Sequence, residues 1–273
     1  MDNPLRQYFR RPSVFITLPS MGKGYSKDVL DLPDNGELPV YPMTAIDEIT
    51  VRTPDALFNG TAVADVIKSC IPAIKDPWEL STSDLDAVLI GIRAAGGQNS
   101  LEINSSCPAC KEESSYGVNL VGLLKTLKLG DYSTPLEINN LKIKFKPMTY
   151  REMNEAAVGQ FDVQKTFAAI EKIEDSTKKV EATQAVIKTI TEITMQLISK
   201  SIEYIEVPDN KVTETEFIAD FLKNCDANIY EAIRDYNTNL KSSTELKPLE
   251  ITCVSCNHEY QQPFTLNASD FFG

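Results

Sequence analysis

Two CxxC motifs, each behind the same Leu-Glu-Ile triplet, constrain the fold of this chain more than any other feature. The first stands in LEINSSCPACKEESSYGV at 101–118 and the second in LEITCVSCNHEYQQPF at 249–264. A CxxC in the turn between two strands directs both sulfur atoms into one concavity, and two such turns complete a tetrahedral zinc site with Zn–S distances of about 2.3 Å. The sequence therefore predicts one structural zinc ion per chain, held by four thiolates. The predicted ligands are Cys107, Cys110, Cys253 and Cys256.

Other chemistry for the cysteines is less well supported. His258, the single histidine, follows Cys256 by two residues and is an alternative ligand, although four thiolates already fill the shell. A thioredoxin-like dithiol would need a helix start after the motif, whereas we expect strands on both sides. Iron is an alternative metal, since it also accepts four thiolates. Cys70 and Cys225 stand at matching positions on apolar helical stripes and are predicted to be buried side chains rather than ligands.

The two motifs belong to longer segments that match in the same order, which indicates an internal duplication. YPMT matches KPMT, ADVIKSC matches ADFLKNC, and Leu-Glu-Ile then precedes each CxxC. The sequence thus predicts an α+β fold in which a unit of strand, helices and zinc hairpin occurs twice, and a ribbon-like four-cysteine zinc site joins the halves. Residues 1–130 are the first repeat, with N-terminal strands, and residues 131–273 are the second.

The second repeat contains an insertion. Thr44 precedes Cys70 by 26 residues, whereas Thr149 precedes Cys225 by 76, so about 50 residues are inserted at about 155–205. Apolar residues recur there at helical spacing, which predicts an αα hairpin. The apolar positions are Met153, Ala157, Phe161 and Phe167 in the first helix and Val186, Ile190, Ile193 and Leu197 in the second. We expect these stripes to pack on each other, although an arm that projects to bind a partner helix also fits the pattern.

Short motifs predict where several elements begin or turn. Thr44 and Thr149 are expected helix N-caps, each followed three residues later by an acidic residue, and Ser83 carries the same signal. Asn139 and Asn140 are expected to form the turn of a β-hairpin within LEINNLKIKFK.

Charge and composition disfavour several functional classes. The 39 acidic and 27 basic residues give a net charge of −12, whereas a nucleic-acid-binding protein normally carries a basic patch. The local basic cluster Arg6, Arg10 and Arg11 is expected to be a solvated terminus. No apolar run reaches the roughly 20 residues of a membrane span, and the N-terminus lacks the features of a signal peptide. We therefore expect a cytosolic protein with reduced thiols that binds neither membrane nor nucleic acid.

The sequence offers little material for catalysis. The stretch MGKG at 21–24 lacks the GKS or GKT ending of a phosphate-binding loop. A single histidine, beside an expected metal ligand, leaves little for a general-base pair or a catalytic triad. We predict that the protein is not an enzyme.

Beyond these motifs, residues 13 to about 120 resemble a known family. The segments that carry the likeness are, in order, ITLPSMGKGY, LPVYPMTAIDEI, PDALFNGTAVADVIKSCIP, DLDAVLIGIRAAGG and CPAC. They resemble the baseplate hub assembly proteins of T-even-type contractile-tailed bacteriophages. The second half departs from the pattern through its helical insertion and the loss of an LPSxG element.

The resemblance implies a late phage protein that acts in assembly of the baseplate hub, as a chaperone or as a structural subunit retained in the virion. The implied partners are other hub proteins and the tape-measure protein. The implied locations are the host bacterial cytoplasm during assembly and the tail baseplate of the virion. A zinc-ribbon nucleic-acid-binding or transcription factor is the alternative, which the acidic charge disfavours. The sequence does not indicate the oligomeric state or the hub surface that is bound.

Overall fold

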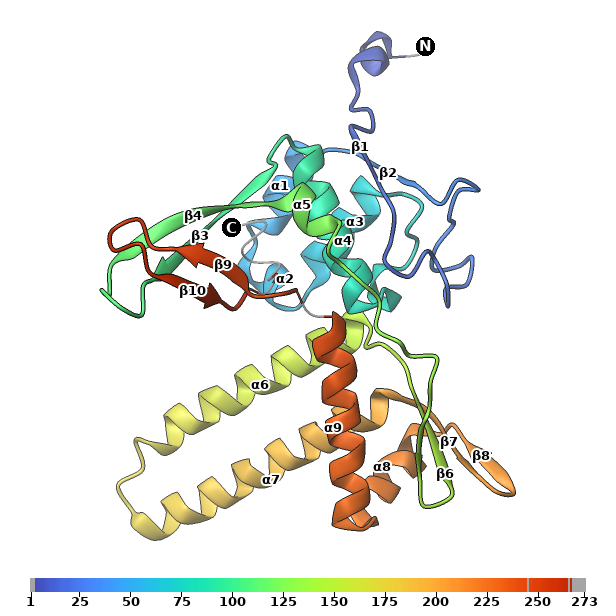
Figure 1. Ribbon diagram of the computed structural model, residues 1–273, viewed down its shortest axis with the longest axis vertical. Coiled ribbons are helices and arrows are strands. Elements are labelled where there is room, and N and C mark those ends of the chain that lie inside the picture. The colour runs from blue at the N-terminus through green and yellow to red at the C-terminus, as the bar shows by residue number, and fades with distance from the viewer. Residues whose placement is uncertain (1–2, 245, 265, 267–273) are drawn as a thin grey trace. The chain divides into compact units, whose positions relative to one another are not determined.

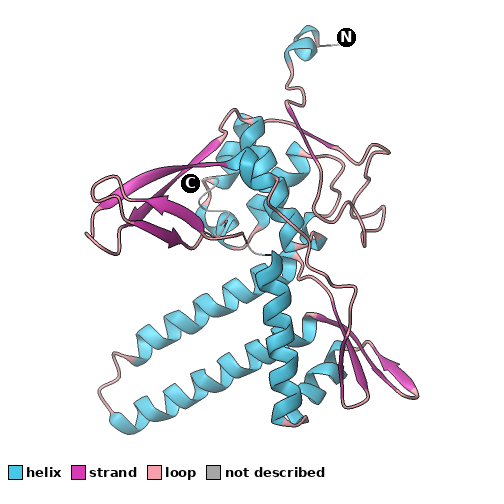
Figure 2. Ribbon diagram, viewed as in Figure 1, coloured by secondary structure: helices cyan, strands magenta, loops and turns pink. Residues whose placement is uncertain are grey.

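The computed structural model describes residues 3–244, 246–264 and 266, and the chain is α+β, as predicted (Figure 1). Helices and small antiparallel sheets alternate along it (Figure 2). Contacts divide the chain into two compact units. Unit 1 is Met1–Leu129 with Thr244–Gly273, and unit 2 is Gly130–Ser243. The C-terminal segment thus belongs with unit 1. The predicted boundary between two repeats at residue 130 describes a duplication of the sequence rather than a compact unit, and it stays a prediction.

Unit 1 is built around the helix α4, which is buried on almost every side. Its elements before the first CxxC hairpin are η1 (Pro4–Tyr8), β1 (Val14–Ile16), β2 (Leu38–Val40), α1 (Ala45–Val51), α2 (Pro54–Phe58), α3 (Thr61–Cys70), η2 (Pro77–Glu79) and α4 (Thr82–Ala95). The predicted N-terminal strand is β1, which pairs antiparallel with β2. Gly91 allows α4 to approach β1, because an added Cβ would lie 2.9 Å from Ile16 Cγ2.

Both predicted capping boxes are confirmed. Thr44 Oγ1 accepts a hydrogen bond from the Asp47 N–H at 3.2 Å, and the Asp47 carboxylate accepts one from the Thr44 N–H at 2.7 Å. In unit 2, Thr149 Oγ1 accepts from the Glu152 N–H at 3.2 Å, and the Glu152 carboxylate accepts from the Thr149 N–H at 2.9 Å. These reciprocal bonds satisfy backbone donors at the starts of α1 and of α6 (Tyr150–Ile170).

The predicted N-cap at Ser83 is wrong by two residues. Ser81 caps α4 instead, since its Oγ accepts from the Asp84 N–H at 3.3 Å. The Asp84 carboxylate is fully buried and accepts from the Ser20 N–H at 2.9 Å and from the Tyr25 hydroxyl at 2.5 Å. The same hydroxyl accepts from the Ser81 N–H at 2.8 Å, and burial raises the pKa of Tyr25 well above its ordinary value. This network fixes the segment between β1 and β2 on α4.

A second polar network corrects the prediction that Arg10 belongs to a solvated terminus. Its side chain is 27% exposed and lies 3.3 Å from the Asp47 carboxylate. The guanidinium also donates to the carbonyl oxygens of Pro42 at 2.7 Å and Ser69 at 2.8 Å. The other two arginines of the cluster are exposed. Arg10 therefore attaches the N-terminal segment to the start of α1 and the end of α3.

Unit 2 contains a four-stranded antiparallel sheet in the order β5-β6-β7-β8. The strands are β5 (Leu136–Ile138), β6 (Leu141–Phe145), β7 (Ile202–Val207) and β8 (Asn210–Val212), followed by the helices α8 (Thr215–Asn224) and α9 (Ala227–Thr244). The predicted Asn-Asn turn is confirmed, because Asn139 and Asn140 connect β5 to β6 with φ values of 45° and 62°. Two consecutive positive φ angles are typical of a type I′ hairpin turn.

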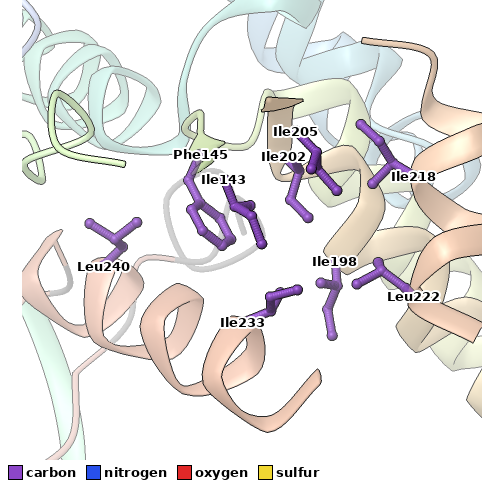
Figure 3. Packing of buried hydrophobic residues seen from close by; sticks show 9 residues of the cluster. All are labelled: Ile143, Phe145, Ile198, Ile202, Ile205, Ile218, Leu222, Ile233 and Leu240. Atoms are coloured by element: carbon purple, nitrogen blue, oxygen red, sulfur yellow. The ribbon is translucent and has the colours of Figure 1, made fainter. Parts of the chain in front are cut away.

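The hydrophobic core of unit 2 lies among this sheet, α8, α9 and the end of α7 (Ser176–Lys200) (Figure 3). The side chains of Ile143 and Phe145 on β6 point toward Ile233 on α9. The other members of the cluster are Ile198, Ile202, Ile205, Ile218, Leu222 and Leu240. Burial of these side chains provides the main stabilisation of unit 2.

The predicted αα hairpin is confirmed as α6 and α7, which lie side by side in unit 2 (Figure 1). It begins about five residues earlier than the expected insertion, at Tyr150. The helices approach closely at Gly159, where an added Cβ would lie 3.5 Å from Ile193 Cδ1. Val186 on α7 is buried, but Phe167 on α6 stays 38% exposed, so the apolar stripes are covered only in part. No helix in the described part of the chain is long and apolar enough to cross a membrane.

Candidate metal centre

Each CxxC motif occupies the loop of a β-hairpin, as predicted. The strands are β3 (Ser100–Ser106) and β4 (Glu113–Asn119) in the first hairpin, which α5 (Leu120–Leu124) follows, and β9 (Leu249–Thr252) and β10 (Glu259–Gln262) in the second. Ser106 pairs with Glu113 and Thr252 pairs with Glu259, so residues 107–112 and 253–258 form loops of the same length. The two hairpins lie beside each other in unit 1 (Figure 1).

The two loops also share one conformation. In the first, the Cys107 N–H donates to the Glu112 carbonyl and the Lys111 N–H donates to the Cys107 carbonyl, both at 2.9 Å. In the second, the Cys253 N–H donates to the His258 carbonyl and the Asn257 N–H to the Cys253 carbonyl, again at 2.9 Å. The residue after each second cysteine has a positive φ, 63° at Lys111 and 58° at Asn257. Each loop therefore places its two cysteines in the same way.

The four predicted ligands are brought together. Their sulfur atoms all lie within 4.8 Å of one another. The Cys107 and Cys256 sulfurs are 3.7 Å apart, as are those of Cys110 and Cys253. A tetrahedral ion with Zn–S bonds of about 2.3 Å requires sulfur–sulfur distances of about 3.8 Å, because the tetrahedral edge is about 1.63 times the bond length. A disulfide would instead need about 2.05 Å. The donor set and spacing therefore fit a four-thiolate metal site.

The electrostatics of the site also favour a bound cation. The N–H groups of Cys110 and Ala109 point at the Cys107 sulfur and lower the pKa of this thiol to about 6. At Cys256 the N–H of His258 acts in the same direction, but the neighbouring sulfurs and burial outweigh it and raise the pKa to about 12. Thiolates this close repel one another, and a positive ion at the centre of the cluster would offset that repulsion. Soft sulfur ligands in this geometry suit zinc or iron.

Polar side chains beside the cysteines hold the hairpins together, and the sequence analysis did not identify them. Ser105 on β3 lies 2.9 Å from the Tyr260 hydroxyl on β10 and donates to Gln262 Oε1 at 2.9 Å. Burial raises the pKa of Tyr116 on β4, and a hydrogen bond between Tyr116 and Tyr260 raises it further. The alternation of strand residues places these groups on one face of each hairpin, but the sequence alone does not say which faces meet.

The other candidate ligands lie outside the cluster. His258 contributes its backbone carbonyl to the loop, while its exposed ring stacks on Tyr260 with a centroid distance of 6.3 Å. Cys70 is fully buried, as predicted, and burial raises its pKa to about 11. Cys225 is only half-buried at the end of α8, so the prediction that its side chain is buried is wrong.

The fold and site together define an α+β protein with a candidate four-cysteine metal centre, assembled from hairpins 143 to 149 residues apart in sequence. A family model described as T4 bacteriophage base plate protein matches residues 26–273, and the chain belongs to that family. The likeness seen in residues 13–120 thus extends through the second half. No curated protein and no solved structure matches the chain.

Proposed function

We propose that this baseplate-family protein acts in assembly of the baseplate hub without catalysing a reaction. The family match over residues 26–273 carries the proposal, because it covers both units and the candidate metal centre. The protein would act either as an assembly chaperone or as a hub-associated structural subunit. Its partners would be other hub proteins and the tape-measure protein, met in the host cytoplasm while the tail is built.

Infection with a phage unable to make this protein tests the proposed role. We expect incomplete baseplates without a hub to accumulate, and supplying the protein from a plasmid should restore complete tails. Normal yields of infectious particles without the protein would refute the role. Mass spectrometry of purified virions then distinguishes the two proposed roles. A fixed copy number of this protein indicates a structural subunit, and its absence from the virion indicates a chaperone.

We further infer that one zinc ion per chain stabilises unit 1. The ion would connect Cys107 to Cys253, which are 146 residues apart in sequence, and so hold the C-terminal hairpin on the first one. Structural zinc can contribute on the order of 10 kcal/mol to folding. A chelator should therefore lower the melting temperature of the wild type but have little further effect on Cys107→Ser. As a matched control, Cys225→Ser should keep the response to chelator, and an equal response in both variants would refute the inference.

We also infer that the two halves arose by duplication. Thr44 and Thr149 cap helices with the same reciprocal bonds, and the two CxxC loops share their length, hydrogen bonds and positive φ. The sulfur contacts are also symmetric. The first cysteine of each loop lies 3.7 Å from the second cysteine of the other loop, in the pairs Cys107–Cys256 and Cys253–Cys110. Replacing residues 107–112 by the sequence of residues 253–258 should therefore preserve metal binding. Loss of metal with intact folding would contradict the equivalence of the loops.

A further inference from the structure

One long face of the α6–α7 hairpin is exposed and largely apolar. On α6, positions 153, 160 and 167 recur every seven residues, and on α7 positions 180 and 187 do the same, so each row follows one side of its helix. Ile187 is 54% exposed and Val180 is 56% exposed. We call this surface the arm face and define it by Met153, Gln160, Phe167, Val180, Ile187 and Ile190.

The two rows border a common groove. A groove of about 250 Å³ runs between α6 and α7, and both Gln160 and Ile190 line it. Val163, Ile193 and Leu197 give the groove further apolar lining, and the uncharged Gln164 and Thr194 complete it. A groove between two packed helices receives side chains of a further helix, because ridges of one helix surface fit the grooves of another. The arm face therefore has the shape of one half of a helical bundle.

Charge indicates which occupant fits. None of the six arm-face residues is charged, although 24% of the chain is charged and its net charge is −12. Lys165 and Phe161 lie outside this set, and the Lys165 ammonium is 4.3 Å from the centre of the Phe161 ring. A two-fold interface places a patch against its own copy, so any net charge in it would meet the same charge. A neutral face allows two such acidic chains to meet without opposing like charges.

The available area is sufficient for a dimer. The 21 residues of α6 give a length of about 30 Å, and two helices side by side are about 20 Å wide. The face then offers about 600 Å² per copy and about 1,200 Å² in total, which is the lower end of specific protein interfaces. Burial of the exposed apolar side chains would supply most of the association free energy.

We propose that a second copy of this chain covers the arm face, so that two α6–α7 hairpins form a four-helix bundle about a two-fold axis. Met153, Phe167 and Ile187 would be buried at the interface, and side chains of each copy would enter the groove of the other. The contact depends neither on the candidate metal centre, which lies in unit 1, nor on the proposed role in hub assembly.

Sedimentation velocity of the full-length protein at micromolar concentration tests the proposal. The wild type should sediment at twice the chain mass of 30.3 kDa. Ile187→Glu and Phe167→Glu should each sediment at the mass of one chain, since each would place two buried carboxylates at the two-fold contact. Thr189→Glu is the matched control. It adds the same charge to the same helix at an exposed position about 200° around from Ile187, and should stay dimeric.

Circular dichroism must show the same helix content in all four proteins, which separates loss of the contact from loss of folding. A wild type of single-chain mass at these concentrations would overturn the proposal and leave a helix of another protein as the occupant of the arm face. A dimer that survives both glutamate substitutions would also overturn it, because the contact would then lie elsewhere.

Discussion

The stability of unit 1 depends on the buried carboxylate of Asp84. It is fully buried and accepts hydrogen bonds from the Ser20 N–H and the Tyr25 hydroxyl, which connect the segment between β1 and β2 to α4. Asp84→Asn keeps the size of the side chain and an oxygen that can accept from Ser20. Its amide hydrogens, however, would face the Tyr25 hydroxyl, which already accepts a hydrogen bond from Ser81.

The magnitude follows from the bonds lost. A hydrogen bond to a charged group contributes about 1.5–3 kcal/mol, and an unsatisfied buried partner costs a similar amount. Asp84→Asn weakens one such bond, so we expect it to lower the free energy of unfolding by about 2–3 kcal/mol. Asp84→Ala removes both bonds and should cost about 3–5 kcal/mol.

Urea unfolding followed by tryptophan fluorescence measures these values in the relevant unit. Trp78 is the single tryptophan of the chain and lies in η2 of unit 1, so its signal reports that unit. Asp28→Asn is the matched control, because Asp28 is exposed in the same segment as Tyr25. It should change the stability by less than about 0.5 kcal/mol.

A double-mutant cycle tests whether the hydrogen bond itself is responsible. Combining Asp84→Asn with Tyr25→Phe should cost about 1–2 kcal/mol less than the sum of the single substitutions, because both remove the same contact. Strictly additive effects, or an Asp84→Asn variant as stable as the control, would refute the reasoning.

Two further substitutions in unit 1 have defined outcomes. Burial raises the pKa of Asp86 to about 7 from an ordinary value of 3.8. The folded state therefore holds this proton more tightly than the unfolded state, and stability falls as the pH rises through that range. Asp86→Asn should be about 3–4 kcal/mol more stable than the wild type at pH 8, because each unit of pKa shift corresponds to about 1.4 kcal/mol. The difference should become small near pH 4, and an equal difference at both pH values would contradict this. Arg10→Ala should destabilise unit 1 by about 1–3 kcal/mol, because it leaves the Asp47 carboxylate and two carbonyl groups without their guanidinium donor. Arg11→Ala, at an exposed site, should leave the stability unchanged in the same fluorescence assay.

Features that depend on neighbouring residues were predictable from the sequence. The capping boxes at Thr44 and Thr149 and the Asn139–Asn140 turn follow from local hydrogen bonding and backbone preference, and all are present. The clustering of the four cysteines was predictable for a similar reason. A CxxC loop fixes two sulfurs locally, and tetrahedral coordination then requires a second pair.

Features that depend on tertiary packing were not predictable in the same way. Ser81 and Ser83 carry similar capping signals, and only the buried position of Asp84 decides between them. Arg10 resembled a solvated terminal residue because its partners Pro42, Asp47 and Ser69 are 32 to 59 residues away in sequence. The exposure of one face of the αα hairpin was likewise not predictable, since helical periodicity identifies apolar stripes but not which residues cover them.

X-ray absorption spectroscopy at the metal edge, combined with elemental analysis of the purified chain, tests the central claim most directly. The structure predicts one ion per chain, coordinated by four sulfur atoms at about 2.3 Å, and loss of that ion on Cys253→Ser as well as on Cys107→Ser. Two ions per chain, a shell with fewer sulfurs, or full occupancy after Cys253→Ser would show that the two hairpins do not share a metal.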